Sequence, residues 1–138
     1  MLKSFVDEFD LSKERARVTP ADPGSVLVQA DESHVPDPVK HKYFRSGVGK
    51  LLYMARWSRP DIQNAVRELS KQSQRPTLAH EKAMHRVMKF CVDTPERGWF
   101  LNSTRRWDGI DREFQFRVRG KADADFAKCP KTRRSVSG

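Results

Sequence analysis

The sequence predicts an α+β fold in which a three-helix bundle is followed by strands. Apolar residues recur at helical spacing between residues 43 and 92, and short proline-marked corners divide that stretch into three helices. The period then changes to strict alternation over residues 114–126, which is typical of a strand with one buried face. A chain of 138 residues is long enough for one domain, and its 37% hydrophobic content indicates a modest core.

Residues 1–40 form an acidic, proline-rich leader. Residues 2–9 predict a short helix, because their large apolar side chains share one side at helical spacing. Four of the eight prolines follow between residues 11 and 40, and they predict a loop or tether.

Residues 41–95 form the predicted helical domain, which begins with a helix over residues 43–56. Two glycines, Gly47 and Gly49, fall within this first helix. Each costs about 1 kcal/mol relative to alanine, so they indicate either close packing against another helix or tolerance of weak positions.

Two further helices follow. The segment Ser58-Arg-Pro-Asp61 predicts the start of the second, with Ser58 as its cap, and this helix extends to about Gln74. Pro76-Thr77 ends that segment and caps a third helix over residues 78–92.

Strands are predicted in the last segment, residues 96–138. Gly98 to Leu101 predicts a short strand, and residues 114–126 predict a longer one. In the longer strand, large or small apolar residues alternate with polar or charged ones, and Gly120 marks a bulge or bend.

Charge is distributed unevenly along the chain, whose net charge is +9. Residues 1–39 carry 4 basic and 8 acidic side chains, whereas residues 40–138 carry 23 basic and 10 acidic ones. This asymmetry predicts that an acidic leader precedes a region that meets a polyanion, and nucleic acid is the favoured partner. The alternative is a basic surface that serves only solubility.

Basic residues form stripes on the predicted helices. Lys82, Arg86 and Lys89 share one side of the third helix, and Arg67 and Lys71 share one side of the second. Such stripes suit contacts to phosphates, although a solvated amphipathic face has the same pattern. The complete set of candidate nucleic-acid-binding residues is Arg67, Lys71, Lys82, Arg86, Lys89, Arg117, Arg119 and Lys121.

The pair Asp123-Ala-Asp125 is the sharpest local feature. Two carboxylates two residues apart in a strand project from the same face, and two hard oxygen ligands suit Mg²⁺ bound to a phosphate. Asp123 and Asp125 are therefore candidate metal ligands. The alternative is a pair of surface acids.

Several protein classes are excluded. Cys91 and Cys129 form no Cys-x-x-Cys or Cys/His set, which argues against a zinc finger or a disulfide scaffold and for an intracellular protein with free thiols. No stretch approaches the roughly 20 apolar residues of a membrane helix, so no membrane partner is expected. The acidic residues near the N-terminus argue against a signal peptide.

Several of these segments resemble one family in the same order. Tyr43 to Ala55, Ser58 to Ile62, Pro76-Thr77 with His80, Gly120 to Ala127 and Arg133 to Gly138 are similar to segments of Copia-type retrotransposon Pol polyproteins. The resemblance covers nearly the whole chain. Each motif is weak alone, and their shared order and spacing make the resemblance specific.

The resemblance implies a fragment of a reverse transcriptase and ribonuclease H region. Residues 41–95 would be a thumb or connection that binds an RNA–DNA hybrid or DNA duplex without sequence preference, and residues 96–138 the truncated start of a ribonuclease H-like sheet. Asp123 would be the family's first catalytic, Mg²⁺-binding carboxylate. The partners would include the upstream palm and the downstream ribonuclease H segments, in a cytoplasmic particle or the nucleus.

The fragment is expected to be inactive alone. The chain contains no Asp-Asp pair for polymerisation and no acidic residue after Asp125, so we expect it to use no cofactor, although the complete parent enzyme would use Mg²⁺. The alternatives are a stand-alone DNA- or RNA-binding module, a protein-interaction module and a non-functional transposon remnant.

Overall fold

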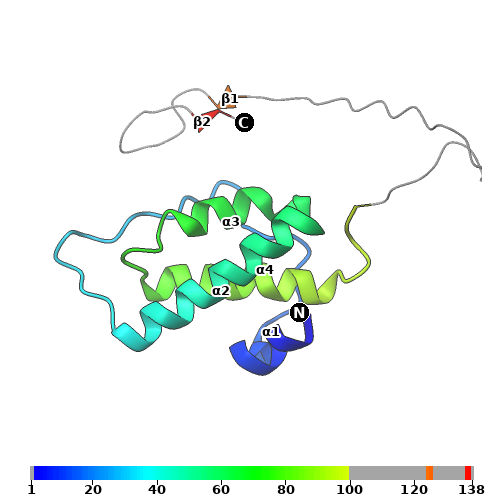
Figure 1. Cartoon of the computed structure of the whole chain (residues 1–138), viewed down its shortest axis with the longest axis horizontal. Helices are drawn as coiled ribbons and strands as arrows, with labels where there is room; N and C mark the ends of the chain where they lie inside the picture. The colour runs from blue at the N-terminus through cyan, green and yellow to red at the C-terminus, as the bar shows by residue number, and fades with distance from the viewer. Residues whose placement is uncertain (1, 100–123, 126–135, 138) are drawn as a thin grey trace, which may run out of the picture. The chain divides into compact units, whose positions relative to one another are not determined.

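The computed structural model describes residues 2–99, 124–125 and 136–137 (Figure 1). The chain divides into two units, residues 1–102 and residues 103–138. In the described part of the first unit the elements are α1 (Leu2–Phe9), η1 (Leu11–Lys13), α2 (Pro38–Trp57), η2 (Pro60–Ile62), α3 (Gln63–Ser70) and α4 (Leu78–Asp93). Within the described residues, no helix has both the length and the apolar character needed to cross a bilayer.

The predicted α+β fold is wrong. Residues 2–99 contain only helices and the loops between them, and Gly98 and Trp99 do not form the predicted short strand. Elsewhere in the described residues, β1 (Ala124–Asp125) pairs antiparallel with β2 (Val136–Ser137). Two residues per strand provide no face that could be buried, so this pair is not a ribonuclease H-like sheet. Most of the predicted strand over residues 114–126 lies outside the described residues.

The helical bundle itself is confirmed, and its core lies between α2, α3 and α4, with α1 packed against α4 (Figure 1). Most of the apolar side chains that recur at helical spacing are buried, but Val6, Leu52 and Leu78, which the spacing also assigned to the buried side, are exposed. The buried side chains include Phe5, Phe9, Phe44, Val48, Leu51, Ile62, Val66, Leu69, Met84, Val87, Met88 and Phe90.

Helix α2 packs closely against α4 at Gly47. A Cβ atom at this position would lie 2.8 Å from the Met88 Cε atom and closer still to the Met84 Sδ atom. Gly49 is different, because a Cβ atom there would meet nothing within 4 Å. The close-packing interpretation therefore holds for Gly47, and Gly49 is a weak helix position on the solvent side.

The corner after α2 differs from its prediction. Ser58 does not cap the following helix but ends α2, because its backbone N–H donates to the Met54 carbonyl at 2.9 Å. The chain then makes the short turn η2, and α3 ends at Ser70 rather than near Gln74. Arg59 is 2% exposed in this corner, so its side chain points into the protein.

Helix α4 begins where the sequence predicted, after Thr77. The Thr77 backbone N–H donates to Nδ1 of His80 at 3.1 Å, so His80 takes the role that an acidic residue usually has in a capping box. Its Nε2 therefore carries the proton and donates to the Val28 carbonyl at 2.9 Å. One neutral histidine thus both caps α4 and binds the leader.

The leader runs along α4 in the opposite direction to the helix. The Arg17 backbone N–H donates to Asp93 at the end of α4, and Val28 contacts His80 in its first turn. Between these points, Asp22 forms an ion pair with Arg86. The loop predicted for residues 11–40 therefore lies against the chain's own helix.

Candidate nucleic-acid interface

The predicted stripe on α4 is largely neutralised by carboxylates. Arg86 forms an ion pair with Asp22 at 2.7 Å and donates to the Thr19 hydroxyl at 3.0 Å, and its side chain is 16% exposed. Lys89 forms an ion pair with Asp93 at 2.5 Å and is 18% exposed. Lys82 is exposed and forms no ion pair among the described residues. The three residues share a face of α4, but among them only Lys82 presents a cation without an ion pair to a described residue.

Asp93 is held in its ionised form. Burial acts to raise its pKa, but the hydrogen bonds from Lys89 and from the Arg17 backbone N–H outweigh burial and lower the pKa below its usual value. The carboxylate therefore stays charged at neutral pH and continues to bind Lys89.

The predicted stripe on the second helix is also paired. Glu68 lies between the two cations, with its carboxylate 2.8 Å from Lys71 and 3.5 Å from Arg67. Because the carboxylate offsets part of their charge, this pair of residues attracts phosphate less than the spacing alone suggested.

The remaining predicted site residues lie outside the described part of the chain. Arg117, Arg119, Lys121 and Asp123 belong to this group, and for Asp125 the structure gives only its backbone pairing with Val136. Within the described residues, no group of three or more His, Cys, Asp and Glu side chains could hold a metal ion. The described residues therefore provide no site that fits Mg²⁺.

A different basic surface lies on α2, and the sequence analysis missed it. Helix α2 contains five Lys and Arg residues and no Asp or Glu in its 20 residues. Its solvent side presents cations together with exposed aromatic and apolar side chains at helical spacing. We call this side the α2 outer face, and it consists of Lys42, Arg45, Ser46, Gly49, Leu52, Tyr53, Arg56 and Trp57.

The cations of the α2 outer face are available to bind an anionic ligand. Lys42, Arg45 and Arg56 are exposed, and none of them forms an ion pair with another described residue. The nearest basic neighbour on the helix, Lys50, points elsewhere and is paired with Glu8 of α1. The α2 outer face therefore carries positive charge that no carboxylate on its own helix offsets.

Aromatic rings occupy the C-terminal end of the α2 outer face. Tyr53 is 58% exposed and Trp57 is 65% exposed, and their ring centroids lie 6.4 Å apart. The Arg56 guanidinium lies 5.9 Å from the Trp57 ring, which is cation–π distance. Exposed aromatic rings next to cations are typical of nucleic-acid-binding surfaces.

The local sequence explains why this side of α2 faces solvent. Asp37 caps the helix by accepting a hydrogen bond from the Val39 N–H at 3.1 Å, and Pro38 fits the first helical position. The apolar stripe through Phe44 and Leu51 then turns inward onto α3 and α4. The signal that could have found this surface was the absence of acidic residues over residues 38–57, which the apolar periodicity did not draw attention to.

Two other chemically notable side chains are structural. Arg59 donates two hydrogen bonds to the Asp61 carboxylate, at 2.9 and 2.8 Å, and others to the Thr94 carbonyl and hydroxyl, each at 2.9 Å. The hydrogen bonds from Arg59 lower the pKa of Asp61. Burial raises the pKa of the Cys91 thiol to about 12, so this thiol stays protonated and unreactive.

The chain is similar to several known proteins, and each match covers part of the chain. The chain is 36% identical over 83 residues to the retrovirus-related Pol polyprotein from transposon RE2 of Arabidopsis thaliana. This match covers 60% of the chain and 5% of the polyprotein. The chain is a relative of transposon Pol polyproteins.

Two further relatives match at similar identity. An uncharacterized mitochondrial protein of Arabidopsis thaliana is 33% identical over 81 residues, which are 59% of the chain and 65% of that protein. The secreted RxLR effector protein 161 of Plasmopara viticola is 32% identical over 100 residues, which are 72% of the chain and 64% of the effector. No protein-family model matches the chain, and no solved structure does.

Proposed function

We propose that the chain is a fragment of a retrotransposon reverse transcriptase and ribonuclease H polyprotein whose helices bind template–primer duplex without sequence preference. The relation to transposon Pol polyproteins supports the origin, and the chain spans 5% of the length of the RE2 polyprotein. Polymerase and ribonuclease activities belong in this proposal to the complete parent enzyme. The fragment binds nucleic acid and catalyses nothing alone.

The observation that carries the binding proposal is the α2 outer face, where three cations lie on a helix without a single acidic residue. Lys42, Arg45 and Arg56 are spaced along one side of α2, so together they offer contacts to several phosphates of a duplex. The α4 stripe contributes mainly Lys82, because Arg86 and Lys89 are paired. This location replaces the one that the basic stripes of the sequence indicated.

The experiment measures binding of the full chain to a fluorescein-labelled RNA–DNA hybrid and to a DNA duplex of unrelated sequence. We expect similar affinities for both, and a logarithm of affinity that falls linearly with the logarithm of salt concentration. The triple variant Lys42→Ala/Arg45→Ala/Arg56→Ala should bind about tenfold more weakly or worse, and its salt slope should be smaller by about three.

Lys40→Ala is the matched control, because Lys40 is an exposed cation on a different side of the same helix. It should leave both the affinity and the salt slope nearly unchanged. Equal losses in Lys40→Ala and in Arg45→Ala would show that net charge, not the α2 outer face, governs binding. Absence of binding to either duplex at 50 mM salt would refute the proposal and favour the protein-interaction alternative.

A further inference from the structure

The aromatic end of the α2 outer face has no role in gripping a duplex. Phosphates are bound by cations, and the bases of a duplex are stacked on one another and do not offer their faces. Tyr53 and Trp57 nevertheless expose more than half of their surface at the C-terminal end of α2, with Arg56 beside the indole ring. An unpaired base has two free faces, and stacking on an aromatic side chain is its usual mode of binding.

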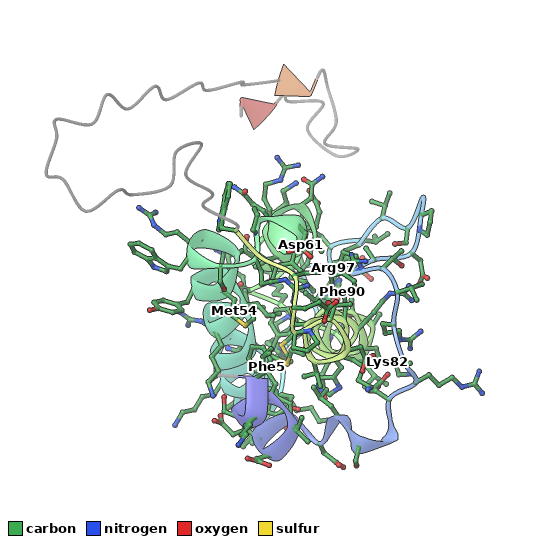
Figure 2. The ribbon with its side chains drawn as sticks, turned by 90° about the vertical axis from the view of Figure 1, so that its right-hand side faces the viewer. Phe5, Met54, Asp61, Lys82, Phe90 and Arg97 are labelled. Carbon is green, nitrogen blue, oxygen red and sulfur yellow. The ribbon has the colours of Figure 1, made fainter. Side chains whose placement is uncertain are left out.

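Tyr53 also lines a groove of about 500 Å³, which residues of α1, of the end of α2 and of the segment after α4 complete. Its lining is mostly apolar and includes Leu2, Met54 and Pro95. The size suits a planar ring such as a nucleobase, and the tyrosine ring at its edge joins it to the α2 outer face. Figure 2 labels Met54 and Arg97, two of the residues that line this groove.

Positive charge surrounds the groove. Lys3, Arg59 and Arg97 line it, and no carboxylate is among its described lining residues. Arg59 is committed to Asp61, but Lys3 and Arg97 are exposed and form no ion pair with another described residue. Both side chains are therefore available to bind the phosphates that flank a base in the groove.

We propose that Tyr53, Trp57 and the adjoining groove bind an unpaired stretch of a nucleic-acid strand. Bases stack on the Trp57 indole and on the Tyr53 ring at the entrance of the groove, while Arg56, Lys3 and Arg97 hold the connecting phosphates. The inference rests on the proposed function and extends it from a duplex to the single strand that continues beyond the duplex. Charge complementarity favours this partner over a protein segment, because every charged side chain of the α2 outer face is a cation.

The test compares the full chain and its variants for binding to fluorescein-labelled dT12 and to a hairpin DNA duplex without overhangs. Trp57→Ala should weaken dT12 binding about tenfold, and should change duplex binding by less than about twofold. Trp57→Phe should keep dT12 binding near the original value, because it keeps an aromatic ring. Tyr53→Ala should act in the same direction as Trp57→Ala.

Leu52→Ala is the matched control for an apolar contact. Leu52 is 46% exposed on the same face but has no ring on which a base could stack. It should leave dT12 binding unchanged. If Leu52→Ala and Trp57→Ala weaken dT12 binding equally, or if neither does, the stacking proposal is overturned.

A second measurement follows the three indole N–H signals in a two-dimensional ¹⁵N NMR spectrum during titration with dT12. The signal that Trp57→Phe removes should shift most. The two proposals fail separately in these experiments. If Trp57→Ala binds dT12 as well as the unmodified chain does while duplex binding is present, only this inference is overturned, whereas absence of duplex binding by the unmodified chain overturns the proposed function.

Discussion

The outer faces of α2 and α4 look alike in sequence and differ in the folded chain. Both carry basic residues at helical spacing, and α4 has the more regular stripe. On α4, Arg86 and Lys89 are held by Asp22 and Asp93, and the leader lies along the helix. On α2, the cations have no acidic neighbour on their own helix.

This difference teaches that the spacing of cations predicts a face but not its free charge. The carboxylate that neutralises Arg86 comes from Asp22, 64 residues earlier in the chain. No window of neighbouring residues reveals such a pair. The availability of a charge is a tertiary property, whereas its direction on a helix is a local one.

The largest expected effect is at the corner that joins α2 to the end of α4. Arg59→Ala should lower the free energy of unfolding by about 2–3 kcal/mol, because it leaves Asp61 and the Thr94 carbonyl without their buried donor. Both faces would then lose their fixed arrangement. Urea unfolding followed by circular dichroism measures the change.

Arg56→Ala is the control for this corner, since Arg56 is an exposed arginine three residues earlier without an ion pair in the described part of the chain. It should change stability by less than about 0.5 kcal/mol. A loss of stability as large as that of Arg59→Ala would mean that the α2 outer face is itself structural, which would contradict the contrast between α2 and α4.

The next effect separates the inner and outer sides of α2. Gly47→Ala should destabilise the chain by about 1 kcal/mol, because its methyl group would press on the buried ends of Met84 and Met88. Gly49→Ala should stabilise it by up to about 1 kcal/mol, because the added methyl group meets open space and alanine favours the helix. Thermal unfolding of the two variants gives the signs, and changes of the same sign would contradict this assignment of the sides.

A smaller effect sharpens the contrast within α4. Arg86→Ala should cost about 1 kcal/mol of stability, because it removes the bonds to Asp22 and Thr19 that hold the leader. Lys82→Ala should cost close to nothing, since Lys82 is exposed. Proteolysis within the leader should speed up in Arg86→Ala alone. If Arg86→Ala instead weakens duplex binding as much as Arg45→Ala does, the two faces do not differ in the way described.

The smallest effect is a dependence on pH through His80. Burial lowers the pKa of His80 below its ordinary 6.5, so the folded chain resists a proton that the unfolded chain accepts. Stability should therefore fall as the pH decreases through 6.5 towards the lowered pKa, and it should be fully present above 6.5. Protonation at Nδ1 would also break the hydrogen bond from the Thr77 N–H.

His80→Gln isolates this contribution, because an amide has both a donor for Val28 and an acceptor for Thr77 but does not titrate. Urea midpoints at pH 7.5 and pH 5.5 should differ less in His80→Gln than in the original chain. An equal difference would assign the pH dependence to the other histidines.

Part of the fold was predictable from particular residues. Apolar periodicity predicted α1, the core of α2 and the extent of α4, and Thr77 predicted where α4 begins. These features depend on contacts within a few residues along the chain. The sheet prediction failed because alternation of apolar residues describes one strand, whereas a sheet also requires partners that the described residues do not supply.

The sequence by itself determined the helices, the excess of cations and the lack of acidic residues in α2, because composition and local spacing fix these properties. Only the tertiary structure decided that Gly47 is packed and Gly49 is open, that Arg59 is buried, and that Asp22 lies on Arg86. Each of these depends on segments that are distant in the chain and adjacent in space. For that reason, the basic surface proposed from the structure lies on α2, whereas the sequence had indicated a stripe on α4.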